Sequence, residues 1–338
     1  RRRTTLHLSA NDRPPATSVT IDPTVVVTAG ALPRKEPTMN TPTHAVVVAI
    51  GADGHTAALH FGVAEALRRR RPLHLVHVLQ SPVGRVYAGI YNDMLDLAKR
   101  TLDAALATAH RLAGGEIPVT AELVDDGWVV DDLVRGTEHA SVLVMQHRAL
   151  SRLTRVFSGS VVAGTAGRAH VPVISVPETW EHSGTTKGFV TAAVQDPTEA
   201  PGLLRAAFDE AGSRGARLVV LHAWWLSSGY DAVAVDDAAR AEKAALFRAE
   251  LEPALAPLEA AHQDVRVSLD VRHAPPIEAV LDAGDVSDLL VLGRRHHLLP
   301  AGSHLGPIAR VALARSTAPV LVAPEQTNDR EEGHQGSS

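Results

Sequence analysis

Short apolar runs alternate with helix-like stretches along the chain from His44 onward. Segments of strand length, apolar throughout or at alternate positions, lie at 45–50, 73–78, 119–123, 142–145 and 171–176. Segments of helical character lie between them at 56–69, 95–109, 130–137 and 159–169. Strands that alternate with helices in this way predict a parallel β-sheet covered by helices.

The same order of elements recurs in the second half of the chain. Strand-like segments lie at 188–194, 218–223, 265–271, 289–292 and 320–322. Helix-like segments begin at Glu199 and cover 238–261, and shorter ones flank the strand at 289–292. Each half of the chain therefore predicts five strands and four helices.

A shift of 147 positions aligns the last third of each half without a gap. The matched pairs are Val144 with Val291, Arg148 with Arg295, Gly159 with Gly306, Arg168 with Arg315, Pro172 with Pro319 and Pro177 with Pro324. His77 falls near His222 with a slip of two positions, so the repeated unit is a whole domain. We therefore predict an α/β protein of two tandem, doubly wound, five-stranded parallel-sheet domains of Rossmann-like type.

The segments outside the two repeats are polar or lack periodicity. The first of them is rich in Arg and Pro, without the amphipathic stripe or apolar core of a targeting peptide, and Met39 is the expected native start. The predicted boundaries are a disordered leader at 1–43, a first domain at 44–178, a linker at 179–187, a second domain at 188–325 and a disordered tail at 326–338.

Composition narrows the classes of function. With 338 residues, 45% of them apolar, the chain can bury two cores. The net charge of -5 comes from acidic and basic residues that are mixed along the chain, which argues against a nucleic-acid partner. The lack of cysteine excludes thiolate sites and suits a cytoplasmic protein, and no apolar run approaches the roughly 20 residues of a membrane span.

The segment after the fourth strand of each repeat is the expected ligand site. In an open parallel sheet, ligands bind beyond the carboxyl ends of the strands, and a helix N-terminus there offers N–H groups to phosphate. In the second repeat this segment contains Gly293, His296, and then Gly306 followed by Pro307. The corresponding residues of the first repeat are Gln146, Ala149, Gly159 and Ser160.

This spacing resembles the universal stress protein family, in which Gly-X2-Gly-X9-Gly followed by Ser or Thr cradles the phosphates and ribose of ATP. The first repeat keeps only the closing Gly159-Ser160 pair. The second keeps the first and third glycines, with His296 at the second glycine position and Pro307 in place of the hydroxyl residue. The resemblance covers residues 44–178 and 188–325 and implies the fold of the adenine nucleotide alpha hydrolases.

The resemblance also implies an Asp at the end of the first strand, close to adenine or ribose. Asp53 is its best counterpart in the first repeat, and either Gln195 or Asp196 takes that place in the second. Arg148 and Arg295 occupy equivalent places where a guanidinium could bind phosphate or face solvent. The predicted ligand-binding residues are Asp53, Gly159, Ser160, Gln195, Asp196, Gly293, Arg295, His296, Gly306 and Pro307.

Three hypotheses of function follow from the resemblance. The first is a stress-response protein whose second domain binds ATP or a related adenine nucleotide, with Mg²⁺, as a regulatory ligand, while the first domain is mainly structural. The second is a scaffold of the same fold that binds no nucleotide, and the third is slow ATP hydrolysis. No catalytic residue is predicted, and the last strands are expected to pair the two domains as an intramolecular pseudo-dimer, with room for a homodimer of chains.

Other candidate sites have simpler explanations. His296, His297 and His304 lack an accompanying carboxylate at zinc-ligand spacing, so no metal site is expected. The acidic residues at 125–126 and 131–132 lie at a helix start, where carboxylates cap the helix. Trp224-Trp225 suits adenine stacking, the closing edge of a core or a domain interface. Walker, dinucleotide-fingerprint and nucleophile-elbow motifs do not occur in the sequence.

Overall fold

The computed structural model describes residues 39–52, 54–80, 88–125, 127–147, 158–182, 186–226, 235–294 and 305–324. All of these lie within one compact unit that begins at Pro37. The two sequence repeats form two α/β domains of parallel strands, which confirms the predicted fold class. The predicted leader up to residue 38 and the tail at 326–338 lie outside the described residues.

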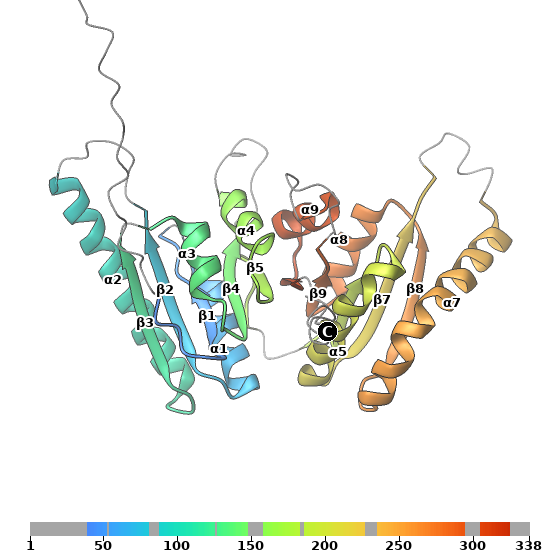
Figure 1. The fold of residues 1–338 in the computed structure, drawn as a ribbon, viewed down its shortest axis with the longest axis horizontal. Coiled ribbons are helices and arrows are strands. Elements are labelled where there is room, and N and C mark those ends of the chain that lie inside the picture. Colours follow the sequence, from blue (N-terminus) through green and yellow to red (C-terminus); the bar gives the residue numbers. More distant parts are fainter. Residues whose placement is uncertain are drawn as a thin grey trace, which may run out of the picture. The chain divides into compact units, whose positions relative to one another are not determined.

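The first domain contains the described elements between Val46 and Pro177, coloured blue to green in Figure 1. Its strands are β1 (Val46–Ala49), β2 (Leu73–Leu79), β3 (Val119–Asp125), β4 (Val142–His147) and β5 (Val173–Pro177). Its helices are α1 (Thr56–Arg69), α2 (Ala88–Ala113), α3 (Val129–Gly136) and α4 (Ser158–Ala166).

The second domain repeats this order in yellow to red (Figure 1). Its strands are β6 (Phe189–Ala193), β7 (Arg217–Trp224), β8 (Val267–His273), β9 (Leu289–Leu292) and β10 (Val320–Val322). Its helices are the 3-10 turn η1 (Pro197–Glu199), α5 (Ala200–Arg214), α7 (Asp237–Ala261), α8 (Pro276–Val286) and α9 (Pro307–Arg315).

The strands of both domains join in one ten-stranded sheet with the order β3-β2-β1-β4-β5-β10-β9-β6-β7-β8. Neighbouring strands are parallel within each domain, whereas β5 and β10 pair antiparallel, with Ile174 opposite Leu321. This is the pairing of last strands that the sequence resemblance implied. Within each domain the strand order reverses between the first and fourth strands, β1/β4 and β6/β9, and this reversal marks the expected ligand edge.

Two apolar layers cover the two faces of this sheet. The helices α1, α2, α5 and α7 pack on one face over a cluster that includes Leu75, Phe208 and Phe247. The helices α3, α4, α8 and α9 pack on the other over a cluster that includes Leu143 and Leu290. Because the strands are buried on both faces, they read as continuous apolar runs in the sequence. None of the helices in the described part of the chain is long and apolar enough to cross a membrane.

The structure differs from the predicted boundaries at two places. Met39 and Asn40, assigned to the leader, already contact the first domain: the Met39 side chain lies against Gly136, and the Asn40 N–H donates to Glu122 Oε2 at 2.9 Å. Trp180, assigned to the linker, packs edge-to-face on Phe61 with a centroid separation of 5.2 Å. Single large side chains in polar segments find partners that a periodicity argument does not detect.

Candidate functional site

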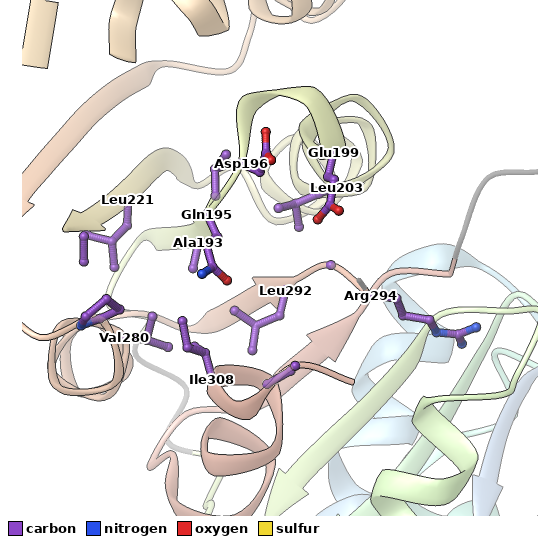
Figure 2. A pocket seen from close by; sticks show the side chains of 16 residues that line it. Ala193, Gln195, Asp196, Glu199, Leu203, Leu221, Val280, Leu292, Arg294 and Ile308 are labelled. Carbon is purple, nitrogen blue, oxygen red and sulfur yellow. The ribbon is translucent and has the colours of Figure 1, made fainter. Parts of the chain in front are cut away.

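A cleft opens at the carboxyl ends of β6, β7 and β9 in the second domain, at the point where the strand order reverses. Its empty volume is about 700 Å³, including the space open to solvent. Gln195, Asp196, Gly293 and Gly306, four of the predicted site residues, line it together. Figure 2 shows Gln195 within the cleft between Leu292, Val280 and Ile308.

Gly293 is not required by the protein's own packing. A Cβ at this position would lie 3.8 Å from Leu203 Cβ, an ordinary van der Waals distance. Its backbone is also outside the left-handed region that favours glycine. A residue that neither conformation nor packing requires leaves space for a bound molecule to approach the backbone.

The N-terminus of α9 forms another wall of the cleft. Gly306 is the N-cap residue, in extended conformation with φ of -65° and ψ of 164°, and it supplies no capping side chain. Pro307 occupies the first helical position, where its missing N–H is not needed within the helix. The N–H groups of Ile308 and Ala309 follow in the first turn, and both residues line the cleft.

The rim of the cleft carries two carboxylates. Hydrogen bonds from the Thr198 side chain and backbone, at 2.7 and 2.9 Å from Asp196 Oδ1, hold the pKa of Asp196 below its ordinary value. Figure 2 shows Glu199 beside Asp196 at the start of α5. An ionised carboxylate at this rim can accept hydrogen bonds from hydroxyl groups of a ligand.

The arginine of this cleft is Arg294. Its side chain points away from the other lining residues in Figure 2, and its Nη2 donates to the Ala169 carbonyl oxygen of the first domain. The predicted phosphate ligands Arg295 and His296 lie outside the described residues. Arg148, the equivalent of Arg295 in the first domain, lies outside them as well.

The corresponding place in the first domain is filled by a side chain. Gln146, which aligns with Gly293, accepts hydrogen bonds at Oε1 from Ala57 N at 2.9 Å and from Ala58 N at 3.4 Å. The Gln146 amide therefore satisfies the N-terminus of α1, where orphan N–H groups would otherwise be open to an anion. The sequence revealed the loss of the glycine but not the new partner of the amide. Gly159 and Ser160 lie in the first turn of α4.

The sheet register refines the equivalence of the two first strands. Val46 pairs with Val142 and Val190 pairs with Leu289, so that Val190 corresponds to Val46 and Val194 to Ile50. His77 and His222 confirm this, since their Nδ1 atoms donate to the carbonyl oxygens of Ile50 and Val194 at 2.6 and 3.0 Å.

Gln195 is therefore the counterpart of Gly51, and Asp196 that of Ala52, so neither of the two residues predicted as alternatives matches Asp53 in this register. Ile50 precedes His77 by 27 positions and Val194 precedes His222 by 28, so the spacing from strand end to histidine differs by one position. Asp53 itself lies outside the described residues.

His147 at the end of β4 is a polar core residue that the sequence did not single out. It is 5% exposed, and its Nδ1 lies 2.7 Å from Ser175 Oγ. Its Nε2 is buried without a hydrogen-bond partner among the described residues. Burial lowers the pKa of His147 to about 4, so the ring is neutral at physiological pH.

The remaining candidates have structural roles. Asp132 Oδ2 accepts a hydrogen bond from Trp128 N at 2.5 Å at the start of α3, as predicted, whereas Asp131 pairs with Arg168 and Asp125 accepts from Tyr91. Trp224 and Trp225 pack on His273, with centroid separations of 4.6 and 4.9 Å, and β7 lies three strands away from β10 in the sheet. No group of three potential metal ligands occurs within the described ranges; His296, His297 and His304 lie outside them.

Comparison with known proteins relates both domains to one family. The family model described as "Universal stress protein family" matches residues 42–177 and 190–324. Universal stress protein Rv2005c of Mycobacterium tuberculosis is 28% identical over 315 residues, which cover 86% of this chain and 98% of that protein. Universal stress protein Rv1996 of the same organism is 25% identical over 302 residues, covering 82% and 94%.

The fold is also similar to a solved structure. The crystal structure of a universal stress protein from Archaeoglobus fulgidus matches with a TM-score of 0.58 at 17% identity, and the match covers 82% of this chain and 96% of that one. At this identity the likeness concerns the fold.

Proposed function

Because the chain belongs to the universal stress protein family, we propose that its second domain binds ATP or a related adenine nucleotide as a regulatory ligand. The first domain then serves mainly as structural support. Binding in the cleft of the second domain would alter conformation or the choice of partner rather than lead to a chemical step.

The cleft offers matching chemistry for each part of a nucleotide. Leu221, Ala223 and Val280 form apolar walls that suit a planar base. The carboxylates of Asp196 and Glu199 suit the ribose hydroxyls, or Mg²⁺, which prefers oxygen ligands. The first turn of α9 and the backbone of Gly293 suit phosphate, because helix N-terminal N–H groups favour negative charge.

The observation that carries the proposal is the contrast between Gln146 and Gly293. The two residues occupy aligned positions, Gln146 near the end of β4 and Gly293 directly after β9, yet one fills the site with an amide and the other leaves it open. Since Gly293 is not needed for packing or backbone conformation, its retention favours a ligand in the second domain.

The test exchanges these two residues. Purified wild-type chain, Gly293→Gln and Gln146→Gly are compared for thermal unfolding with and without Mg-ATP, and denatured protein is chromatographed for released nucleotide. A ligand at about 100 times its Kd stabilises the folded state by about 2.7 kcal/mol. We expect this stabilisation in the wild type and in Gln146→Gly, and its loss in Gly293→Gln.

Gln146→Gly is the matched control, because it changes the equivalent position while sparing the second domain. It should unfold at a lower temperature than the wild type, since loss of a helix cap costs roughly 0.5–2 kcal/mol. Stabilisation that survives in Gly293→Gln would contradict the proposed site. If neither nucleotide nor stabilisation is found in any of the three proteins, the alternative of a non-nucleotide scaffold is favoured. Phosphate release that depends on Gly293 would instead support ATP hydrolysis.

A further inference from the structure

A second and larger cavity lies where α1 meets α5 and the segment that links the domains. Its empty volume is about 1290 Å³, including space open to solvent. Side chains from both domains line it, among them Phe61, Arg68, Trp180 and Arg214. None of these four residues lines the cleft described above.

One wall of this cavity is a symmetric cluster of ion pairs. α1 ends with Glu65 and Arg69, and α5 ends with Glu210 and Arg214 at equivalent positions, since both helices close on the next residue in the left-handed conformation. The pairs cross between the helices: Arg69 contacts Glu210, and Arg214 donates to Glu65 Oε2 at 3.0 Å. Two carboxylates and two guanidinium groups thus satisfy each other.

Arg68 adds a third guanidinium to this balanced cluster. Its equivalent in the second domain is Ser213, to which it donates, and its second hydrogen bond goes to Glu65. A guanidinium carries five N–H donors, so Arg68 retains donors beyond these two bonds among the described residues. The buried cluster, in which Arg68 also lies 3.6 Å from Glu210, therefore has one excess positive charge. Arg68 lines the cavity together with Lys187 and with the carboxylates of Glu65, Glu181 and Asp288.

The electrostatic states of Arg68 and Arg69 differ accordingly. Burial lowers the pKa of Arg68, and the carboxylates near it do not fully compensate. Burial acts on Arg69 in the same direction, but Glu210 and Glu65 outweigh it and raise the pKa of Arg69. Arg69 does not line the cavity among the described residues, whereas Arg68 does. An anion in the cavity would supply the compensation that Arg68 lacks.

Two aromatic side chains also line the cavity. Trp180 and Phe61 pack edge-to-face at 5.2 Å between ring centroids, and both line the cavity. Trp180 is only partly buried, so part of its indole ring is available for contact. Aromatic walls with a few charged groups are typical of sites for small organic molecules.

We propose that this cavity is a second ligand site, which binds a small organic anion with an aromatic group. The anionic group pairs with Arg68 and Arg214, and the aromatic group packs on Trp180. Because residues of both domains form the site, an occupant bridges α1 and α5. The proposal does not depend on nucleotide binding in the second domain.

The test uses two fluorescent probes with the same aromatic rings. Anilinonaphthalene sulfonate carries an anionic group, and N-phenylnaphthylamine lacks it. We expect the full chain to bind the sulfonate at one saturable site, at least about tenfold more tightly than the neutral probe, since a hydrogen bond to a charged group contributes enough for that ratio. Arg68→Gln should lower the affinity for the sulfonate by about the same factor.

Arg69→Gln is the matched control. Both variants remove one positive charge from the same cluster, so a larger loss in Arg68→Gln reports direct contact. Ala64→Trp fills the cavity from α1 and leaves the charges of the cluster unchanged, so it should abolish binding. It provides a second test of the site if Arg68→Gln fails to fold. Equal sulfonate affinity in wild type, Arg68→Gln and Ala64→Trp would overturn the proposal. Loss of the sulfonate fluorescence in Gly293→Gln would also overturn it, because the probe would then bind in the cleft of the second domain.

Discussion

Position 146 lies near the end of the fourth strand of the first domain, and the aligned position 293 directly follows that of the second; a side chain occupies this place in one domain only. The Gln146 side chain accepts hydrogen bonds from backbone N–H groups in the first turn of α1 and fills that place. Gly293 leaves the matching place open. At the residue scale, therefore, one domain has a helix cap where the other has a cleft.

His147, beside Gln146, should make stability depend on pH. Its folded-state pKa of about 4 lies below the ordinary value of 6.5, so the unfolded chain binds the proton more readily. The free energy of unfolding should then fall as pH decreases from 6.5 toward 4. The contribution of His147 reaches up to about 3 kcal/mol at the lower limit.

Denaturant unfolding of wild type and His147→Asn across this pH range measures the effect. The free energy of unfolding should decline less steeply with falling pH in the variant than in the wild type. The difference between the two proteins at pH 7.5 serves as the reference. Some decline should remain, because burial also lowers the pKa values of His74, His77 and His222. Parallel curves for the two proteins would show that His147 does not titrate as proposed.

At the scale of elements, α1 connects the features described above. Its N-terminal N–H groups donate to Gln146, its middle approaches β1 closely, and its C-terminal residues join the ion-pair cluster. The close approach occurs at Gly62, where an added Cβ would lie 2.3 Å from Val48 Cγ2. A glycine within a helix is otherwise unfavourable, so the contact with the sheet explains it.

Gly62→Ala should therefore destabilise the first domain, by about 1–3 kcal/mol as for other overpacked cores. Gly212→Ala in α5 is the control, because its Cβ would lie 3.5 Å from Val265 Cγ2, an ordinary contact. That variant should be neutral or more stable by up to about 1 kcal/mol. Chemical denaturation of both variants is the measurement, and similar stability for the two would contradict the packing argument.

At the scale of the whole described chain, the sheet junction and the ion pairs hold the domains together. The antiparallel pairing of β5 with β10 makes one sheet of the two, and α1 contacts α5 through the charged cluster. Burial alone would raise the pKa of Glu65, but Arg214, Arg69 and Arg68 outweigh it and lower the pKa to about 2. Glu65 therefore remains ionised at the centre of the cluster.

Glu65→Gln should lower the free energy of unfolding by roughly 3–5 kcal/mol, because removal of one partner leaves buried charges unpaired. In the wild type, the stabilisation by Glu65 should be present above pH 4.5 and be lost as pH falls toward 2, since the folded-state pKa of Glu65 is lowered. Arg168→Gln, which breaks the half-exposed pair with Asp131 at 2.7 Å, should cost no more than about 1 kcal/mol. Urea unfolding compares them; equal costs would refute the special role of the buried cluster.

The sequence by itself determined the two-domain organisation, the alternation of strands and helices, and the edge of the sheet at which the cleft opens. These follow from apolar periodicity and from a repeat that preserves Gly159 with Gly306, because such signals are local or recur at fixed spacing. Gln195, Asp196, Gly293 and Gly306 could be grouped in advance because carboxyl ends of parallel strands meet at one edge.

Only the tertiary structure decided which partners those residues and others have. The bond from Gln146 to Ala57, the direction of Arg294 toward Ala169, and the contact of Trp180 with Phe61 all join residues far apart in sequence. The crossing of Glu65 and Arg214 between the domains is of the same kind. Such contacts depend on how two sheets join and on where long side chains find space and unsatisfied hydrogen-bonding groups, and no spacing along the chain encodes that geometry.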